Sequence, residues 1–476
     1  MRRRLPVAAA ALALAAIVAA VVLRGGGDGS PPAGPFAGPA VADATLGVLD
    51  YDPDRREWYE RRAAAGLSHV LYAKSPGGAT ASAQRTGAWR PVIERVARRH
   101  GVDADTLEAI VLLESAGRPD AQASSDLEGA VGLTQILAQT GRDLLGMRID
   151  VRASERLTRG IARGRRVRAR EARRRVVDER FDPPKALDAT ARYLVFARER
   201  LGREDLAVAA YHMGVGNLQA VLAALGEGTV PYAQVFFSTS PLRHAAAWRL
   251  LARLGDDSST YLWRVGAARE ILRLAREDPE ELARLERLHA SKNSAEEVLH
   301  PAGQTERFGD PLALGRARAA GELSALRPAQ LRAHALRIDP RMGELAGRLR
   351  QPRRLYRALR PGALSTLLTL GAGTRRVAGP GRLTVTSTVR DEQYQRVLVA
   401  RNVEATSAYS LHTTGWAFDV ARAYRDRRQA LAFQFLLDRL TALNLIAWVR
   451  EPGAIHVTVA GDAADVLAGG EGDTEG

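Results

Sequence analysis

Two groups of residues in this sequence have types and spacings that could support chemistry. In the first, Leu107, Val111 and Glu114 follow one another at steps of four and three, so they share one face of a predicted helix. Asp103 can cap the start of that helix and Gly117 can end it. Burial and the negative end of the helix dipole both raise the pKa of a carboxyl placed there, which suits a proton donor. The alternative is a boundary glutamate whose carboxylate returns to water.

The second group is built around histidines. His412 and Asp419 stand seven residues apart, and the small residues between them suit a turn that leads into a strand and leaves room for a ligand. His456 lies in a later β-branched stretch that is predicted to be a neighbouring strand. Two histidines and a carboxylate, with a fourth position open, describe a catalytic zinc site. The alternative is a pair of core histidines satisfied by the protein itself.

Around Glu114 the chain resembles the soluble lytic transglycosylases. The motifs that carry this resemblance occur in the family's order: Glu114-Ser115, Gly132-Leu133-Thr134-Gln135, Phe181-Asp182-Pro183 and Ala209-Ala210-Tyr211-His212-Met213-Gly214-Val215-Gly216-Asn217. Thr134 stands where the family usually has methionine, and His212 stands where it usually has asparagine. The resemblance covers roughly residues 91–225.

This resemblance implies a lysozyme-like fold and a single catalytic carboxyl, Glu114. The implied reaction cleaves the β-1,4 bond after N-acetylmuramic acid in peptidoglycan and closes a 1,6-anhydro ring, without a cofactor. Substrate-binding roles are implied for Ser115, Gln135, Tyr211 and His212. Asp126 and Glu128 receive no catalytic role.

The stretch from Ser410 to Asp419 resembles the signature of zinc D,D-peptidases of the D-alanyl-D-alanine carboxypeptidase type. The resemblance covers roughly residues 355–462 and implies zinc on His412, Asp419 and His456, with Arg390 holding the substrate. That family has an acidic general base three residues before the last histidine. Here that position is Gly453, and the nearest acid is Glu451, which a bulge at Pro452-Gly453 would have to bring into reach.

Composition limits the number of domains, the charge of the partner and the chemistry that the chain can support. The 476 residues allow two or three domains, and the formal net charge of +15 favours an anionic partner. The absence of cysteine excludes disulfides and thiolate chemistry. Three arginines precede an uncharged apolar run from Leu5 to Leu23, which predicts an uncleaved membrane anchor, or a signal peptide cleaved near residue 20. Both place the bulk of the chain outside the cytoplasm, or secreted if the segment is cleaved.

We expect a multidomain fold: a mainly α lysozyme-like domain, a helical middle region, and a small α+β zinc D,D-peptidase-like C-terminal domain. The expected division is a membrane anchor or signal peptide over 1–24, a flexible tether and short helices over 25–88, a transglycosylase domain over 89–240 with an arginine-rich insert at about 142–180, a helical linker region over 241–354, a D,D-peptidase-like domain over 355–462, and an acidic, glycine-rich tail over 463–476.

The expected partners follow from this organisation. Peptidoglycan is the implied substrate, and the N-terminal segment contacts the membrane. The arginine-rich insert is either a solvated surface helix or a contact for anionic wall polymers or lipid headgroups. Nucleic acid is not expected, because no recognised binding motif accompanies the charge.

Two enzyme activities are thus predicted: glycan cleavage, and a zinc-dependent cleavage of the stem peptide. The sequence leaves alternatives open. One is a hydrolytic muramidase on the same fold, and another is a non-catalytic protein that binds peptidoglycan as a scaffold of the cell envelope.

Overall fold

The computed structural model describes residues 47–164, 166–292, 294–401 and 409–469. These residues form two compact units, each assembled from separate stretches of the chain. Within the described ranges, unit 1 contains residues 74–219 and 254–282, and unit 2 contains 47–73, 220–253 and 283–469. The predicted anchor over residues 1–24, the start of the tether and the tail from residue 470 lie outside the described residues.

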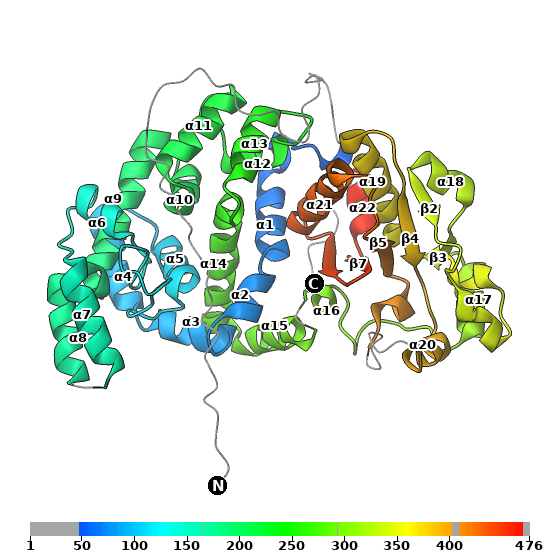
Figure 1. The fold of residues 1–476 in the computed structure, drawn as a ribbon, viewed down its shortest axis with the longest axis horizontal. Coiled ribbons are helices and arrows are strands. Elements are labelled where there is room, and N and C mark those ends of the chain that lie inside the picture. The colour runs from blue at the N-terminus through cyan, green and yellow to red at the C-terminus, as the bar shows by residue number, and fades with distance from the viewer. Residues whose placement is uncertain (1–46, 165, 293, 402–408, 470–476) are drawn as a thin grey trace, which may run out of the picture. The chain divides into compact units, whose positions relative to one another are not determined.

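Unit 1 is helical (Figure 1), consistent with the expected lysozyme-like domain. Its elements are α3 (Ala79–Gly87), α4 (Arg90–His100), α5 (Ala104–Ser115), α6 (Ala138–Asp143), α7 (Val151–Ala162), α8 (Val167–Val177), η3 (Glu179–Phe181), α9 (Pro183–Leu201), α10 (Glu204–Met213), η4 (Ser258–Thr260) and α14 (Tyr261–Glu277). Two further helices, α11 (Val215–Leu225) and α15 (Pro279–Ser291), begin in unit 1 and continue into unit 2.

The helix α5 forms as its sequence predicts. The Asp103 side chain accepts a hydrogen bond from Thr106 N at 2.9 Å and so caps the first turn. Leu107 and Val111 are fully buried against α4 and α9. The helix ends at Ser115, and the left-handed conformation of the next residue, Ala116, stops it one position before the predicted Gly117.

Unit 2 combines helices with strands. Its helices are η1 (Gly47–Leu49), η2 (Pro53–Arg55), α1 (Arg56–Gly66), α2 (His69–Lys74), α12 (Tyr232–Ser238), α13 (Ala245–Arg253), α16 (Glu296–Leu299), α17 (Pro311–Ala319), α18 (Pro328–Ala333), η5 (Glu344–Leu349), η6 (Arg353–Tyr356), α19 (Pro361–Ala378), α20 (Glu392–Val399), η7 (Leu411–Thr414), α21 (Arg427–Ala442) and α22 (Ala463–Leu467). Its strands are β1 (Ser324–Ala325), β2 (Leu336–Ile338), β3 (Ala358–Leu359), β4 (Leu383–Ser387), β5 (Ala417–Ala421), β6 (Ile446–Arg450) and β7 (Ala454–Val459).

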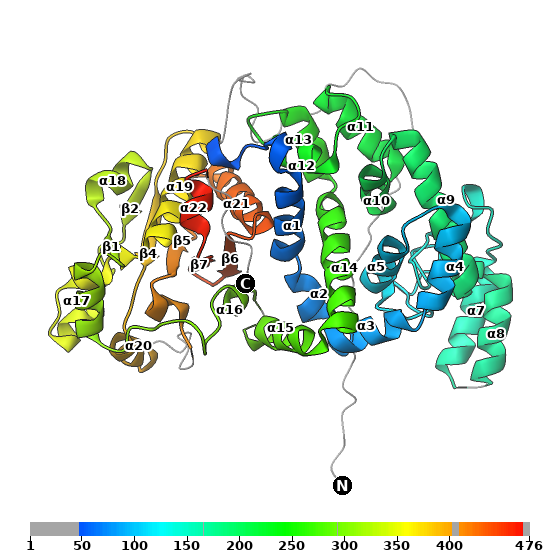
Figure 2. The ribbon, with the colours of Figure 1, turned by 180° about the vertical axis from the view of Figure 1, so that it is seen from behind.

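Among the described residues, five strands form one sheet in the order β2-β4-β5-β7-β6, seen from two sides in Figures 1 and 2. The strand β2 runs parallel to β4, and the other neighbours are antiparallel. The helices α19 and α21 pack against each other, and they contact β7 and β6 respectively. The strands predicted around residues 383–389 and 455–459 are therefore present, and so is the helix predicted to end at Val399.

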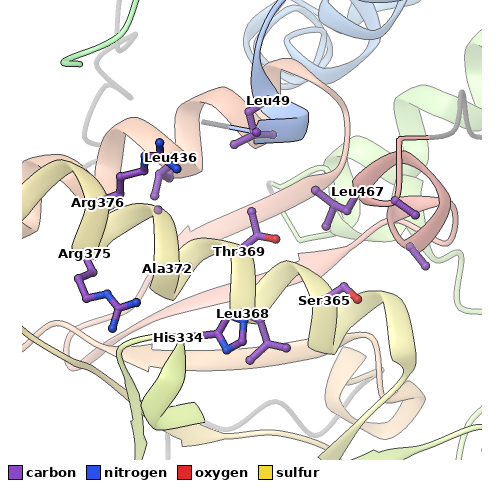
Figure 3. Close-up of a pocket in the computed structure, with 14 residues that line it drawn as sticks. Leu49, His334, Ser365, Leu368, Thr369, Ala372, Arg375, Arg376, Leu436 and Leu467 are labelled. Carbon is purple, nitrogen blue, oxygen red and sulfur yellow. The ribbon is translucent and has the colours of Figure 1, made fainter. Parts of the chain in front are cut away.

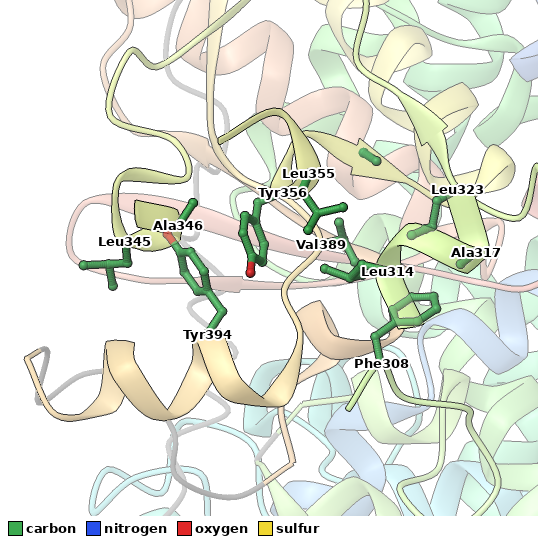
Figure 4. Packing of buried hydrophobic residues seen from close by; sticks show 11 residues of the cluster. Phe308, Leu314, Ala317, Leu323, Leu345, Ala346, Leu355, Tyr356, Val389 and Tyr394 are labelled. Carbon is green, nitrogen blue, oxygen red and sulfur yellow. The ribbon is translucent and has the colours of Figure 1, made fainter. Parts of the chain in front are cut away.

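A cluster of buried side chains joins the middle of the chain to this sheet domain (Figure 4). Phe308 and Leu314 pack in one cluster with Tyr356 and Tyr394, whose ring centroids are 4.5 Å apart. The Tyr356 hydroxyl donates a 2.9 Å hydrogen bond to Asp391, the residue that also caps α20. Residues from 308 onward thus belong to the core of unit 2.

The first described helices of the chain also belong to unit 2. The helix α1 packs on α21. From α1, the buried Arg62 guanidinium donates to Leu443 O at 2.5 Å and to Asp462 Oδ2 at 2.6 Å. The beginning and the end of the described chain are therefore held together by a buried cation.

This division differs from the predicted one. Residues 241–354 do not form a separate helical linker region: α14 packs on α5 in unit 1, whereas α13, α16 to α18 and β2 belong to unit 2. The predicted tail also begins with a helix, α22, which packs on α19. Helical periodicity shows which face of a segment is apolar but does not show which core receives that face. This is why the predicted boundaries fall elsewhere.

Among the described helices, no single one has the length and apolarity to cross a membrane, although the bent pair α10 and α11, with 119° between its halves, meets those two criteria together.

Candidate functional site

Glu114 lies in the last turn of α5 and is half-buried. The Tyr261 hydroxyl, at the start of α14, donates a 2.7 Å hydrogen bond to Glu114 Oε1. Burial raises the pKa of the Glu114 carboxyl, while the charge of His212 and the hydrogen bond from Tyr261 partly oppose that rise. The net effect is a raised pKa, which is the direction that a proton donor requires.

A second glutamate on α5, Glu108, differs from Glu114 in the charge of its hydrogen-bond donors. Glu108 is 1% exposed, and its Oε2 accepts from Arg90 at 2.7 Å and from Arg276 at 2.9 Å. Two arginines, from α4 and α14, thus neutralise this carboxylate and tie three helices together. Glu114 has a neutral tyrosine as its donor instead, which does not stabilise the charged form to the same extent.

Aromatic rings pack around Tyr261, the residue that donates to the Glu114 carboxyl. The Tyr261 ring stacks on the His212 ring with centroids 5.2 Å apart, and on the Tyr211 ring at 6.2 Å. Tyr193 meets Tyr211 edge-on at 5.4 Å. Burial raises the pKa values of Tyr211 and Tyr261, and the negative charge of Glu114 adds to both shifts. These phenols are therefore neutral donors at neutral pH.

The turn from Gly129 to Gln135 approaches a neighbouring backbone closely. Gly132 has φ +83°, and a side chain there would lie 2.0 Å from the Arg180 carbonyl oxygen. The Arg180 side chain is fully buried, pairs with Asp178 at 2.9 Å, and donates to the carbonyls of Leu127 and Gly129. A buried ion pair therefore fixes the turn, and glycine is required because nothing larger fits.

Several predicted substrate-binding groups are bonded within the protein. Ser115 is 2% exposed and its hydroxyl donates to Val111 O, so it does not line a cleft as expected. The Gln135 amide donates to Ala121 O and Gly132 O, which stabilises its own turn. The Tyr211 hydroxyl donates to Thr134 O at 2.7 Å and lies 3.2 Å from Thr190 Oγ1. These residues shape the surroundings of Glu114 from within the fold.

His212 bonds to the segment before α14. Its Nδ1 lies 2.9 Å from Ser258 Oγ, and its Nε2 lies 3.8 Å from Asp257 Oδ1. His212, Asp256 and Asp257 are close enough to hold a cation. However, Arg264 pairs with Asp257, and Asp256 accepts from Ser258 N at 2.9 Å. The carboxylates are thus already engaged in holding η4 beside α10.

The predicted His/Asp/His set also comes together, within unit 2. The register of β5 and β7 places Asp419 directly opposite His456, and His412 stands in η7, just before β5. Asp419 Oδ1 lies 2.9 Å from His456 Nδ1 and 3.2 Å from His412 Nε2. All three residues are buried, and their facing atoms lie within 4.8 Å of one another.

The donor set fits a divalent metal ion such as zinc. Burial, with the charge of Arg390, lowers the pKa of His412 to about 4, so its ring is neutral at neutral pH. Burial alone would raise the pKa of Asp419, but the two histidines outweigh it and hold that pKa well below its usual value. Neutral imidazole and ionised carboxylate are the forms that bind a metal, and His412 and Asp419 favour them. At His456 burial is outweighed by the hydrogen bond to Asp419, which raises its pKa, so a metal bound there would displace a proton. His412 Nδ1 lies 2.8 Å from Thr388 O, which leaves Nε2 facing the centre.

Arg390 and Glu451 differ in their relation to this centre. The half-buried Arg390 guanidinium lies 3.6 Å from Asp419 Oδ2 and donates to Ser387 Oγ at 2.6 Å. Glu451 is exposed at the end of β6. Pro452-Gly453 forms the turn of the β6–β7 hairpin and not the predicted bulge, because Glu451 N donates directly to Ala454 O. The fold therefore brings Arg390 to the centre and leaves Glu451 at its periphery.

Unit 2 also contains a pocket of about 780 Å³ over α19, with Leu436 of α21 and Leu467 of α22 on its walls (Figure 3). Arg375 and Arg376 lie at one end of it. None of the predicted site residues lines this pocket.

Two residues at these sites were not predicted from the sequence: Tyr261, which contacts Glu114, and Glu296, which contacts His456. Both lie in the segment over 241–354, which was expected to be a linker. Local sequence holds no signal for either one, because each contact joins residues more than 100 positions apart.

The comparison with known families finds a match in the stretch of chain that contains Glu114. Residues 91–228 match the family described as the transglycosylase SLT domain. The match covers α5, the turn at Gly132 and α10, and it ends before α14. Members of this family are lytic transglycosylases whose substrate is peptidoglycan. Residues 91–228 of this chain are therefore similar to the transglycosylase SLT domain.

Proposed function

We propose that unit 1 cleaves the bond between N-acetylmuramic acid and N-acetylglucosamine in peptidoglycan, with Glu114 as the only catalytic carboxyl. The observation that carries the proposal is the half-buried Glu114 carboxyl, whose hydrogen-bond donor at 2.7 Å is the neutral hydroxyl of Tyr261; burial raises the pKa of this carboxyl. A protonated carboxyl of this kind can donate to a glycosidic oxygen near neutral pH.

One carboxyl is enough to account for every proton that is transferred in the proposed reaction. The Glu114 proton passes to the glycosidic oxygen as the bond from the muramic acid C1 to that oxygen breaks. The Glu114 carboxylate then takes the proton of the C6 hydroxyl on the same sugar, while the C6 oxygen bonds to C1 and closes the 1,6-anhydro ring. The carboxyl is regenerated and no water is consumed, so a second carboxylate of the usual glycosidase kind is not required.

The nearby acids support a single-carboxyl mechanism. Asp126 and Glu128 are exposed. Asp126 accepts a hydrogen bond from Glu128 N at 2.9 Å, and Glu128 pairs with Arg142 at 2.9 Å. Tyr261 is a positioning residue in this mechanism. Its hydrogen bond holds Glu114 Oε1 and so directs the other oxygen of the carboxyl toward the sugar.

The test is digestion of purified sacculi by the full chain, with mass analysis of the muropeptides. The wild type should release anhydro-muropeptides, which are lighter by one water than the hydrolytic products. Glu114→Gln should release none while its thermal unfolding stays unchanged. Reducing ends without anhydro products would identify a muramidase. Binding to sacculi with identical products from both proteins would identify the non-catalytic scaffold.

A second activity, zinc-dependent cleavage or trimming of the stem peptide, is favoured by the convergence of His412, Asp419 and His456. A bound zinc ion would polarise the scissile carbonyl and acidify water. Arg390 would pair with a substrate carboxylate. Glu451, which is exposed at the end of β6, would be the base.

Chelation separates the two activities in one experiment. Dialysis against a chelator should abolish any peptide cleavage and leave the anhydro-muropeptides unchanged. Restoring zinc should restore only the peptide products. Peptide cleavage that survives chelation and His412→Ala would contradict the metal mechanism.

We also propose a location outside the cytoplasm, where peptidoglycan lies, with the segment over residues 1–24 as anchor or signal peptide. The arginine-rich hairpin of α7 and α8 is proposed to contact anionic wall polymers or lipid headgroups. Most of its arginines are exposed. Arg174 is buried and lies over the Phe181 ring at 3.9 Å.

A further inference from the structure

The two ring nitrogens of His456 face different groups. Nδ1 faces the centre, 2.9 Å from Asp419 Oδ1. Nε2 points the other way and lies 3.5 Å from Glu296 Oε2, in α16, and 3.3 Å from the Thr458 hydroxyl. Glu296 precedes His456 by 160 residues and comes from the segment over 241–354, in which the sequence indicates no catalytic group.

Glu296 is a buried carboxylate with partners on both oxygens. It is 6% exposed. Its Oε1 lies 3.1 Å from Lys292 Nζ, and its Oε2 faces His456. Lys292 is itself fixed by donating to Tyr409 O at 2.5 Å. Burying a carboxylate is costly unless such partners are present, so the position of this side chain is closely specified.

The two histidines of the centre are held in the same way. His412 has Nε2 toward Asp419 and Nδ1 at 2.8 Å from the Thr388 carbonyl oxygen. His456 has Nδ1 toward Asp419 and Nε2 toward Glu296. Metal-bound histidines commonly donate their outer N–H to a carbonyl or a carboxylate, which fixes the tautomer and directs the free lone pair at the metal.

We propose that Glu296 is a positioning residue of the metal centre, accepting the Nε2–H of His456 so that Nδ1 faces the metal beside His412 Nε2 and Asp419. The inference rests on the proposed metal-binding function of unit 2 and deepens it. It supplies the centre with the buried acid that the sequence lacks at Gly453, although in a different role. Because both oxygens of Glu296 are engaged, it orients a ligand and does not activate water.

The test is zinc affinity, measured by competition with a chromophoric chelator on the metal-free full chain. Outer carboxylate partners typically change metal affinity by about 10- to 100-fold. Glu296→Gln should therefore weaken zinc binding about 10- to 100-fold, and should reduce the rise in Tm that zinc produces. Glu297→Gln is the matched control, since Glu297 adjoins Glu296 in α16 and also lies near Lys292, at 3.6 Å. It should leave the zinc affinity unchanged.

The other possible results of this experiment distinguish failure of the metal-binding function from failure of the positioning role. Wild-type protein that binds no zinc would overturn the metal function itself. Zinc binding that is equal in the wild type and Glu296→Gln would overturn the positioning role alone, and a loss confined to Thr458→Val would assign that role to Thr458. Should Glu296→Gln fail to fold, Glu296→Asp decides instead, because it keeps the charge but withdraws the carboxylate from His456. An unweakened affinity in that variant would overturn the proposal.

Discussion

The Tyr261 hydroxyl donates a 2.7 Å hydrogen bond to Glu114 Oε1 across 147 residues of sequence. Tyr261 lies beyond residue 228, where the match to the transglycosylase SLT domain ends. The acid of the site and its donor therefore come from two separate stretches of chain, 74–219 and 254–282, which form one compact unit.

Replacing Tyr261 with phenylalanine should change both rate and pH dependence. The hydrogen bond from Tyr261 lowers the pKa of Glu114, so its loss raises that pKa further. Because the proposed reaction needs the protonated acid, activity should fall as pH rises through the pKa of Glu114, and this alkaline limb should move to higher pH. The rate should fall about 10- to 100-fold with loss of a hydrogen bond to an ionisable group. Tyr193→Phe, which loses a hydrogen bond to Ala210 O instead, is the control, and an unmoved limb in Tyr261→Phe would contradict the assignment.

His212→Asn should move the same limb in the same direction. The charge of His212 lowers the pKa of Glu114, and asparagine removes that charge. The measurement is glycan cleavage from pH 4 to 9, roughly the range in which carboxyl and imidazole groups titrate. His100→Asn removes a histidine paired with Asp188 elsewhere in unit 1 and should leave the limb unmoved. A limb shifted to lower pH in His212→Asn would show that His212 acts on another group.

Gly132→Ala should destabilise unit 1 through two separable effects. The left-handed conformation costs a non-glycine residue about 1–2 kcal/mol. Contact of the new methyl group with the Arg180 carbonyl adds about 1–3 kcal/mol of overpacking. Gly146→Ala isolates the first effect, since Gly146 has φ +59° with nothing within 4 Å of the added carbon. Equal losses of unfolding free energy in the two variants would refute the close approach at Gly132.

Asp178→Asn tests the ion pair that fixes this turn. It leaves the Arg180 guanidinium buried without its counterion, which typically costs about 3–5 kcal/mol. Glu128→Gln breaks the exposed pair with Arg142 and should cost under about 1 kcal/mol. Thermal and denaturant unfolding of the two variants measure the contrast. A small loss of unfolding free energy in Asp178→Asn would show that the turn is stable without the ion pair.

Much of both sites could be predicted from local sequence. The cap at Asp103 and the spacing of Leu107, Val111 and Glu114 define α5, because helix periodicity and capping act within a few residues. The alternation around His456 likewise predicts β7 and the side of the strand on which the histidine lies.

The other features of the two sites depend on contacts between residues that are distant in sequence, and local sequence patterns do not indicate such contacts. Ser115 follows Glu114 directly, yet it is buried with its hydroxyl bonded to the backbone. Tyr261 and Glu296 have helical sequence around them that indicates only amphipathic packing. Their partners are set by which core each helix joins, and that choice is made by the whole fold.

The contact of α1 with the end of the chain has a consequence for biosynthesis. Arg62 binds the carbonyl of Leu443, which is made 381 residues later. Unit 1 has all its residues once Leu282 has left the ribosome, whereas α1 must wait for the last strands and helices of unit 2. The nascent chain therefore completes unit 1 first, and unit 2 closes only when translation is nearly over.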